Sequence, residues 1–244
     1  MIKLGTVQQI ARYPVKSMAG VSVESAELGL HGLLGDRRLA IRRIEDRSGF
    51  PWLSASRLPE LVLYHPFSPD GVGGDVGPSH VRTPSGEELE LQGDRFRNEI
   101  SERAGVRVEV LNLKNGVFDD ADISVISSAT VDSICREAGV PNDPRRFRAN
   151  ILLKTDASSP FVEEQWIGGS LVFGGASGPR ISVTAGDVRC MMINLDPETA
   201  RQDPQVMKTV VRLNNNMAGV YGAVLRAGML DVGQNVFFVP PDAF

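Results

Sequence analysis

One arginine–cysteine pair, Arg189-Cys190, is the strongest indication of chemistry in this sequence. The positive charge of Arg189 would stabilise a thiolate on Cys190, and a thiolate is both a nucleophile and a ligand for soft metals. One interpretation is therefore a reactive or metal-ligating sulfur at the end of a strand. The other is a small buried hydrophobic side chain beside a surface arginine, and the spacing alone leaves both open.

Basic residues gather in three short segments that could bind an anion. The segments cover residues 13–17, 35–38 and 145–150. In a chain with a formal net charge of −4, such clusters suggest a local site for a phosphate-sized ligand. Taken singly, each could also be a solvent-exposed face or a salt bridge at the end of a strand. Ser127-Ser128 adds the amino terminus of a predicted helix, where free N–H groups and the helix dipole favour anions.

Short alternating runs of apolar residues, separated by Gly, Pro and Asp, dominate residues 1–100. They predict strands at residues 21–23, 39–41 and 61–63, a spacing typical of a small β-barrel or sandwich. Residues 66–79 are rich in glycine, which is costly to order, and in proline, which lacks a backbone donor. We expect this stretch to be an exposed loop without a regular element.

The second part of the chain is also predicted to consist mainly of strands. These cover residues 106–110, 123–126, 147–153, 171–173, 181–184, 219–225 and 234–239. Only residues 131–138 and 203–213 have the apolar spacing of a helix. Ser127 or Ser128 can cap the first of these helices, and the spacing places Cys135 on its buried face.

Composition and charge exclude several classes of protein. An excess of 30 acidic over 26 basic residues argues against binding a nucleic-acid backbone. No apolar run approaches the ~20 residues that span a bilayer, so we expect a soluble protein without a membrane partner. Met1 is followed by no apolar signal-peptide core, which predicts a cytoplasmic location. Two cysteines and three histidines are too few for a disulfide framework, a four-thiolate zinc site or an iron–sulfur cluster.

Taken in order, the motifs resemble those of MOSC-domain proteins that carry an N-terminal MOSC β-barrel domain. They are Tyr13-Pro14-Val15-Lys16-Ser17, Gly35-Asp36-Arg37, Ser127 with Thr130, Arg146-Phe147-Arg148-x-Asn150, Arg189-Cys190 with Asp196-Pro197, and Val220-Tyr221-Gly222 with Gly228-Met229-Leu230-x-Val232-Gly233. The ordered set covers almost the whole chain and is far more specific than any one motif. The chain is similar to the mitochondrial amidoxime-reducing component and its bacterial single-chain relatives. Two departures, Glu198 in place of glycine and Ala149 in place of proline, remove no ligand.

The resemblance implies a mainly β (α+β) fold with two domains and a molybdenum cofactor. Residues 1–100 would form the N-terminal barrel-like domain, and residues 101–244 the β-barrel MOSC domain with few short helices. Cys190 would be the protein's ligand to the metal, which the molybdopterin also holds. The implied cofactor-binding residues are Lys16, Ser17, Arg37, Arg146, Arg148, Asn150 and Arg189, with Ser127, Ser128 and Thr130 at the helix start, where the contacting residue is left open.

The activity that the resemblance implies is a molybdenum-dependent reductase acting on small N-hydroxylated compounds. Electrons would come from a separate redox protein, because the chain lacks the four clustered cysteines of the ferredoxin domain found in many bacterial relatives. An alternative is a sulfur carrier that accepts a sulfane sulfur on Cys190 and delivers it to a biosynthetic acceptor. A third hypothesis is a cofactor-binding or storage module without turnover.

Overall fold

A closed barrel of seven strands is the largest element of the computed structural model, which describes residues 1–69 and 77–241. Its strands are β1 (Ile2–Arg12), β10 (Ile123–Ser127), β11 (Ile151–Thr155), β12 (Ser170–Phe173), β13 (Arg180–Val188), β14 (Met217–Arg226) and β16 (Asn235–Val239). They follow the order β11-β10-β14-β13-β12-β16-β1, and β1 pairs with β11 to close the ring. Neighbouring strands are antiparallel except β10 and β11, which are parallel. A short strand, β2 (Val21–Val23), extends the sheet beside β1.

Smaller sheets and helices complete the described part of the fold. One sheet contains β3 (Ser25–Gly29), β4 (Gly32–Leu33) and β15 (Gly228–Asp231), a second contains β5 (Leu39–Arg43) and β9 (Val108–Asn112), and a third contains β6 (His65–Phe67), β7 (His80–Arg82) and β8 (Glu88–Glu90). The helices are α1 (Asp94–Ala104), α2 (Ser128–Ala138) and α3 (Pro204–Asn214). Among the described residues, no helix is both long enough and apolar enough to cross a membrane.

Alternating burial explains why the barrel strands form. In β13, Ile181 and Val183 are buried, whereas Ser182 and Thr184 between and after them are partly or fully exposed. Every barrel strand contributes apolar side chains to one continuous core inside the ring. Each fully buried aliphatic or aromatic side chain stabilises the fold by roughly 1.5–3 kcal/mol, so the barrel core is a rigid base for the loops at its end.

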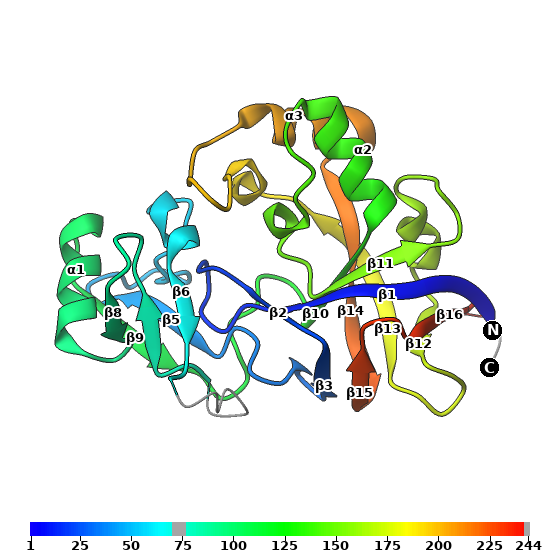
Figure 1. The fold of residues 1–244 in the computed structure, drawn as a ribbon, viewed down its shortest axis with the longest axis horizontal. Helices are drawn as coiled ribbons and strands as arrows, with labels where there is room; N and C mark the ends of the chain where they lie inside the picture. Colours follow the sequence, from blue (N-terminus) through cyan, green and yellow to red (C-terminus); the bar gives the residue numbers. More distant parts are fainter. Residues whose placement is uncertain (70–76, 242–244) are drawn as a thin grey trace.

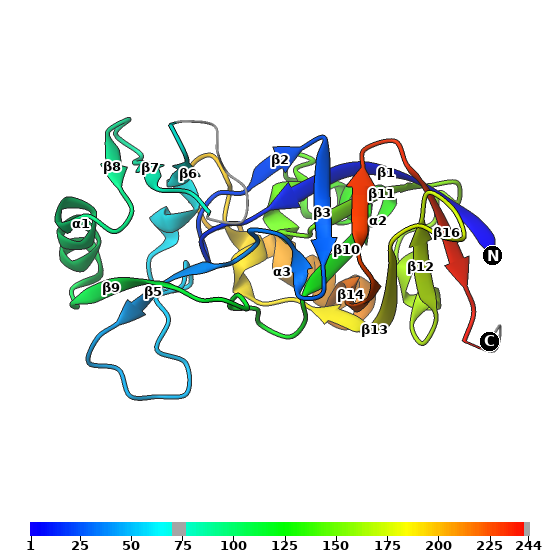
Figure 2. The ribbon, with the colours of Figure 1, turned by 90° about the horizontal axis from the view of Figure 1, so that it is seen from below.

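A second lobe lies beside the barrel and has its own apolar core. Figures 1 and 2 show α1, β5, β8 and β9 at one end of the molecule, and the barrel with both chain termini at the other. The core of this lobe includes Tyr64, Phe96 and Ile100. It also includes Met18, which follows β1, and Leu195, which follows β13. These two loops therefore pack the lobe against the barrel.

Helices α2 and α3 lie together over the barrel (Figure 1). A third apolar cluster joins them to it, and its members include Ile134, Cys135 and Val210. Cys135 is fully buried, as predicted from the helical spacing. The Ser127 hydroxyl accepts a hydrogen bond from the backbone N–H of Thr130 at 3.2 Å, so Ser127 is the residue that caps α2.

Most of the predicted elements of the second part of the chain are confirmed. Strands at residues 123–126, 171–173, 181–184, 219–225 and 234–239 coincide with β10, β12, β13, β14 and β16, and the two predicted helices coincide with α2 and α3. The mainly β fold class is confirmed as well. The division between residues 100 and 101 stays a prediction. Strands β1 and β2, which precede it, complete the sheet formed by strands that follow it.

Two predicted strands are wrong in type or extent. Residues 61–63 belong to a 3₁₀ turn, Pro59–Leu63, in which Leu61 and Val62 are buried side by side. Two adjacent buried side chains do not fit a half-exposed strand, whose side chains alternate between faces. The strand predicted at residues 147–153 begins only at Ile151, because Phe147 ends a second 3₁₀ turn, Pro144–Phe147.

The predicted loop at residues 66–79 is partly wrong. Pro66 and Phe67 belong to β6, where Pro66 lies opposite Val81 of β7. Because β6 is an edge strand, the missing N–H of proline breaks no ladder hydrogen bond on the inner side. Residues 70–76 of this stretch lie outside the described residues.

Helix α1 is absent from the sequence prediction. Only Phe96 and Ile100 of this helix are buried, so its apolar periodicity consists of a single i, i+4 pair. The rest of the helix is polar, with an ion pair between Arg103 and Glu99 at 3.3 Å. The second lobe supplies the partner for this narrow apolar stripe, and local spacing could not reveal that partner.

Candidate functional site

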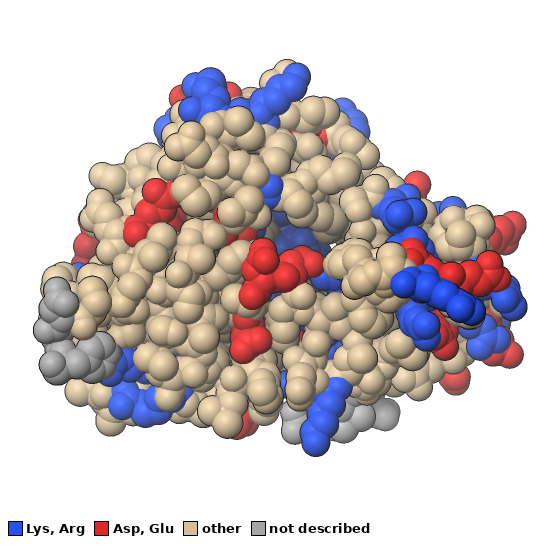
Figure 3. All heavy atoms as spheres, turned by 180° about the vertical axis from the view of Figure 1, so that it is seen from behind, with Lys and Arg blue, Asp and Glu red and all other residues tan. Residues whose placement is uncertain are grey.

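A pocket of about 530 Å³ lies between the barrel and the second lobe, and residues from both halves of the chain line it. On the face of Figure 3, a hollow has basic side chains inside it and acidic side chains at its edge. Seven of the predicted site residues line the pocket. They are Lys16, Ser17, Arg37, Arg146, Arg148, Arg189 and Cys190.

Cys190 lies directly after the end of a barrel strand. Strand β13 ends at Val188, and a 3₁₀ turn, Met191–Asn194, begins after the cysteine. The Cys190 residue is exposed, whereas the side chain of Arg189 is only 7% exposed. A buried cysteine beside a surface arginine, the alternative left open by the sequence, is therefore wrong in both parts. Within residues 1–69 and 77–241, no three His, Cys, Asp or Glu side chains are arranged to hold a metal ion.

Arg189 uses its donors to fix the end of β13. Its Nε donates to the carbonyl of Ala218 at 2.7 Å, and its Nη1 donates to the carbonyl of Phe147 at 2.7 Å. Gly219 makes room for the guanidinium, since its φ is +85° and a Cβ there would lie 3.0 Å from Nη2 of Arg189. Arg189 therefore positions Cys190 by tying β13 to β14 and to the segment before β11.

Asp187 is the buried counter-ion of Arg189. The two side chains form an ion pair at 2.8 Å, and the Ser124 hydroxyl donates to the same carboxylate at 2.8 Å. The Tyr221 hydroxyl lies near the same carboxylate and acts to lower its pKa. Burial raises the pKa of Asp187 above its ordinary value, and the charge of Arg189 opposes that rise. Burial likewise raises the pKa of Tyr221, so its hydroxyl stays protonated and can donate.

A basic wall of the pocket comes from the segments before β5. The Lys16 side chain is 7% exposed and forms an ion pair at 2.6 Å with Asp119, which is 64% exposed. Arg37 pairs with the buried Asp36, and its Nη2 donates to the carbonyl of Arg148 at 3.0 Å. Burial lowers the pKa of Arg37, but Asp36 outweighs this effect and holds the pKa above its ordinary value.

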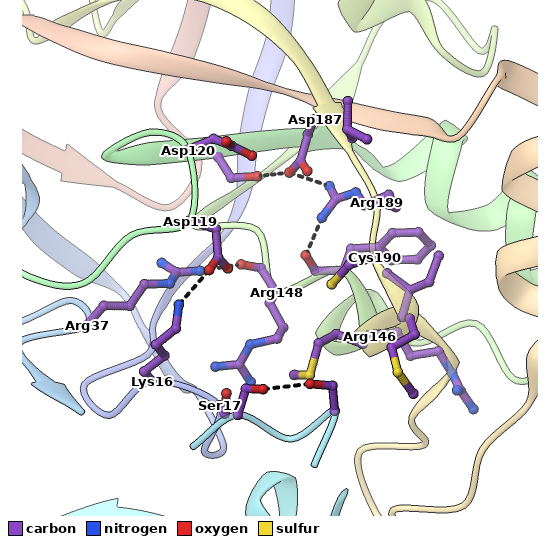
Figure 4. Close-up of a pocket in the computed structure, with 18 of the residues that line it drawn as sticks. Lys16, Ser17, Arg37, Asp119, Asp120, Arg146, Arg148, Asp187, Arg189 and Cys190 are labelled. Atoms are coloured by element: carbon purple, nitrogen blue, oxygen red, sulfur yellow. Dashed lines mark hydrogen bonds and ion pairs between the residues drawn. The ribbon is translucent and has the colours of Figure 1, made fainter. Parts of the chain in front are cut away.

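Arg148 lies between these two walls and has no carboxylate partner among the described residues. It follows the turn Pro144–Phe147 with a φ of 52°. Its guanidinium lies 4.2 Å from the centre of the Tyr13 ring and donates to the carbonyl of Met18 at 2.7 Å. Desolvation lowers the pKa of Arg148 to about 10, so the group is still charged at neutral pH. Figure 4 shows Ser17 beside the Arg148 guanidinium.

The predicted residues at the start of α2 do not line the pocket. Ser127 and Thr130 are buried and hydrogen bonded within the protein. The hydroxyl of Thr130 accepts a hydrogen bond from the backbone N–H of Phe161 at 2.6 Å. Ser128, the first residue of α2, is partly exposed but is also outside the lining. In this structure the residues at the start of α2 therefore stabilise the fold at the end of the barrel and do not contact the pocket.

Asn150 lies behind the basic wall and does not line the pocket. Its Nδ2 donates to Asp36 at 3.0 Å and to the carbonyl of Ala11 at 3.2 Å. It therefore orients the carboxylate that pairs with Arg37. The Asn150 amide, beside the paired strands β1 and β11, thus acts on the site through the Asp36 carboxylate.

Arg146 lines the pocket, but its charge is already neutralised. The side chain is 1% exposed and forms ion pairs with Asp196 at 2.8 Å and with Asp203 at 3.3 Å. It also donates to the carbonyl of Asn194 at 3.2 Å. Arg146 therefore ties the loop after Cys190 to the start of α3.

Several lining residues were not singled out from the sequence. They are Phe50, Ser54, Ser56, Asp119, Asp120, Ser124, Asp187 and Tyr221. Asp187 stands three residues before Cys190, and Tyr221 stands inside one of the quoted motifs, so proximity could have indicated both. Phe50 and Asp120 lie in loops without a spacing pattern, and only the tertiary structure brings them to the pocket.

Two family models match this chain, and each covers about half of it. The model of the MOSC domain matches residues 112–237. The model of the MOSC N-terminal beta barrel domain matches residues 4–130. No curated protein sequence matches the chain.

Solved structures give a fold likeness at low sequence identity. The crystal structure of the YUAD protein from Bacillus subtilis is 14% identical, with a TM-score of 0.51 over 96% of this chain and 94% of that chain. This likeness concerns the fold alone. The crystal structure of YiiM from Geobacillus stearothermophilus is 19% identical, with a TM-score of 0.37 over 48% of this chain and 54% of that chain, too distant to support an argument.

Proposed function

This chain belongs to the MOSC-domain family, and we propose that it is a molybdenum-cofactor reductase of small N-hydroxylated compounds. The family is associated with molybdopterin binding and with molybdenum cofactor sulfurase-like proteins. One observation carries the proposal: a single pocket contains the exposed Cys190 and five basic side chains, three of which are proposed to hold an anion. These three cations are Lys16, Arg37 and Arg148.

The chemistry of the pocket fits a phosphorylated pterin that carries a thiophilic metal. Arg148 has no carboxylate partner in the described ranges, and its lowered pKa reflects the cost of leaving it desolvated. A bound anion would supply the missing counter-charge. The exposed Cys190 supplies the soft sulfur ligand that such a metal prefers. The cavity, at about 530 Å³, is in the size range of cofactor sites.

Each side chain has a separate task in this proposal. Lys16, Arg37 and Arg148 hold the anionic part of the cofactor by charge-assisted hydrogen bonds. Cys190 ligates the metal, and Arg189 fixes the backbone that presents the sulfur. When bound, the cofactor supplies a centre that exchanges an oxygen atom and two electrons with the substrate.

Metal and pterin analysis of the purified protein tests the proposal. We expect molybdenum and pterin in the native protein, and loss of the metal in Cys190→Ala with the fold intact. Cys135→Ala is the matched control, because it removes the other cysteine, which is buried on the core face of α2. Normal reduction of a model amidoxime by the Cys190→Ala protein, with an artificial electron donor, would refute the assignment.

Electron supply gives a second test. With two cysteines the chain cannot assemble an iron–sulfur cluster from its own side chains, and without a nucleotide-binding fingerprint neither a flavin nor a nicotinamide site is evident in the sequence. We expect the purified chain not to oxidise NADH unaided. Reduced viologen should restore turnover, and a small redox protein from the same cell should be more efficient. Robust NADH-dependent turnover by the chain alone, with contaminating reductases excluded, would contradict this expectation.

A sulfur carrier is the second candidate function, and the exposure of Cys190 favours it equally. The Cys190 thiolate would take the outer sulfur of a donor persulfide and release the donor as a thiol. Mass spectrometry of the intact protein separates the two functions. A persulfide on Cys190 without molybdenum supports the carrier, whereas molybdenum with turnover supports the reductase. Molybdenum without turnover would leave a binding or storage module.

The expected location and partners go with this proposal. We propose a cytoplasmic protein that acts on a small N-hydroxylated substrate and takes electrons from a separate redox protein. Nucleic acids and membranes are not among its proposed partners. Fractionation of the source cells, followed by detection of the chain in each fraction, tests the location.

A further inference from the structure

One loop, residues 113–122, brings a carboxylate to the basic side of the pocket. The loop joins β9 to β10. Its Asp119 lines the pocket, and Oδ1 of Asp119 lies 2.6 Å from Nζ of Lys16. Figure 4 shows this ion pair beside the Arg37 guanidinium. The basic side of the pocket therefore already contains an anionic group that belongs to the chain itself.

The two partners of this ion pair differ in how firmly the fold holds them. The Lys16 side chain is 7% exposed, and its Nζ lies 5.6 Å from the centre of the Phe50 ring. The Asp119 side chain is 64% exposed. A buried ammonium is costly without an anion, whereas an exposed carboxylate is already largely hydrated and loses little when the pair opens. Lys16 thus needs an anion, but the fold does not require that anion to be Asp119.

The segment that carries Asp119 is held by few other contacts. The earlier part of the loop is fixed, because the backbone N–H of Val117 donates to the carbonyl of Arg37 at 2.9 Å. Within residues 118–121, the contact with Lys16 is the only hydrogen bond in the described part of the chain. Opening this one ion pair would therefore release residues 118–121 and leave the rest of the loop in place.

The charge of Asp119 also acts, at longer range, on the other two cations of the basic side. Burial lowers the pKa of Arg148 to about 10, and Asp119 is one of the groups that oppose this change. Burial also lowers the pKa of Arg37, and both Asp36 and Asp119 act in the opposite direction. Asp119 is therefore a counter-ion for the same three cations that are proposed to hold the anionic part of the cofactor.

Resting on the proposed function, we propose that Asp119 is an internal counter-ion that holds the place of the ligand's anionic group and is displaced when that group binds. The incoming anion takes over the hydrogen bond from Nζ of Lys16. Two anions beside the same cations repel each other, so binding of one favours release of the more exposed Asp119. Asp119 acts on the ligand through Lys16 and is thus a positioning residue that sets the anion affinity of the pocket.

Binding of inorganic phosphate tests this role without any turnover. Calorimetry measures its affinity for the full chain, produced in cells that cannot make the pterin cofactor. Asp119→Asn should bind phosphate about tenfold more tightly than the native chain, because a charge-assisted hydrogen bond no longer has to be broken first. Asp119→Glu, which keeps the charge, should stay close to the native affinity. Asp122→Asn is the matched control, since Asp122 lies in the same loop and outside the pocket lining.

Backbone hydrogen exchange reports the displacement itself. In the native chain, phosphate should speed exchange in residues 118–121, because the contact that holds them is lost. In Asp119→Asn the same residues should exchange rapidly with or without phosphate. A carboxylate that only supports the shape of the site would give the opposite results, with weaker phosphate binding in Asp119→Asn and slower loop exchange when phosphate binds.

The outcomes separate this inference from the proposed function. The displacement of Asp119 is overturned by unchanged or weaker phosphate binding in Asp119→Asn, by loop exchange that phosphate does not speed, or by a chain that binds no phosphate at all. Molybdenum in the native protein together with any of these results would refute the displacement alone. Absence of molybdenum together with tighter phosphate binding in Asp119→Asn would refute the reductase alone.

Discussion

Arg146 and Arg148 are two residues apart, yet they belong to regions of opposite character. Arg146 meets Asp196 and Asp203 and is 1% exposed, so its charge is fully used in holding the loop after Cys190 to α3. Arg148 meets an aromatic ring and a carbonyl, but no carboxylate of the described residues. In this pair of residues, the cation that two carboxylates neutralise belongs to the scaffold, and the cation without a carboxylate partner among the described residues marks a place for a ligand.

The same distinction applies to the two cysteines and to the hydroxyls predicted at the site. Cys135 is fully buried against α3, whereas Cys190 is exposed in the pocket. The hydroxyls of Ser127 and Thr130 are already hydrogen bonded to backbone N–H groups at and near the start of α2. If the distinction holds, variants in the neutralised region change stability, and variants in the pocket change ligand binding.

The largest expected effect is on stability, from Arg146→Met. This change leaves the carboxylates of Asp196 and Asp203 without their shared cation. Removing one partner of a buried pair costs about 3 kcal/mol, at the low end of the range because both aspartates are partly exposed. Urea unfolding measures the loss. Arg136→Met, which breaks an exposed pair with Asp132, should cost only about 0.5 kcal/mol or less.

Arg148→Met is expected to act on binding instead. The variant keeps an apolar chain against Tyr13 but removes the pocket cation, so cofactor occupancy should fall about tenfold at limiting cofactor. Stability should stay within about 1 kcal/mol of the native protein. Arg107→Met on the distant lobe is a matched control, because Arg107 forms an ion pair with the exposed Glu45 and lies outside the pocket lining. Unchanged cofactor occupancy in Arg148→Met would contradict the proposed difference between Arg146 and Arg148.

A pH-dependent effect of intermediate size is expected from Glu163. This buried carboxyl accepts a hydrogen bond from the backbone N–H of Ser127 at 3.4 Å, and burial raises its pKa above the ordinary 4.5. The folded state therefore holds the proton to higher pH than the unfolded chain. Its contribution to stability is full below pH 4.5 and is lost as the pH rises through the raised folded pKa.

Glu163→Gln keeps the neutral form at every pH. The variant should match the native protein in acid and be more stable at neutral pH, by about 1.4 kcal/mol for each unit by which the native pKa is raised. Unfolding by urea across a pH series measures this difference. A parallel change in cofactor occupancy would show that the start of α2 communicates with the pocket after all.

The smallest expected effect comes from Ser127→Ala. Loss of the cap at the start of α2 should cost about 1 kcal/mol and leave cofactor occupancy unchanged. Thermal unfolding and molybdenum content are measured on the same preparation. Cofactor occupancy could also fall because part of the protein is unfolded. A larger fall than this loss of stability accounts for would support the predicted contact between the start of α2 and the cofactor.

The sequence predicted the elements whose local pattern is strong. The alternation in β13 and the capped helical spacing of α2 are repeated signals, and both are confirmed. Helix α1, with one buried i, i+4 pair, and the 3₁₀ turn Pro59–Leu63 carry weak or misleading patterns. Their conformation depends on the core of the second lobe, which is made from segments far apart in the chain.

For the site, residue type and order indicated which groups could bind, but not which of them are free to do so. By itself the sequence determined the mainly β class, the arginine–cysteine pair and the set of basic segments, because these depend on local pattern and side-chain chemistry. Only the tertiary structure decided that Arg189 is buried and Cys190 exposed. It also decided that Arg146 is neutralised and that Asp120 joins the pocket without a partner among the described residues. The physical reason is that burial and counter-ions come from residues distant in sequence, so the local pattern cannot show which charges the fold has already paired.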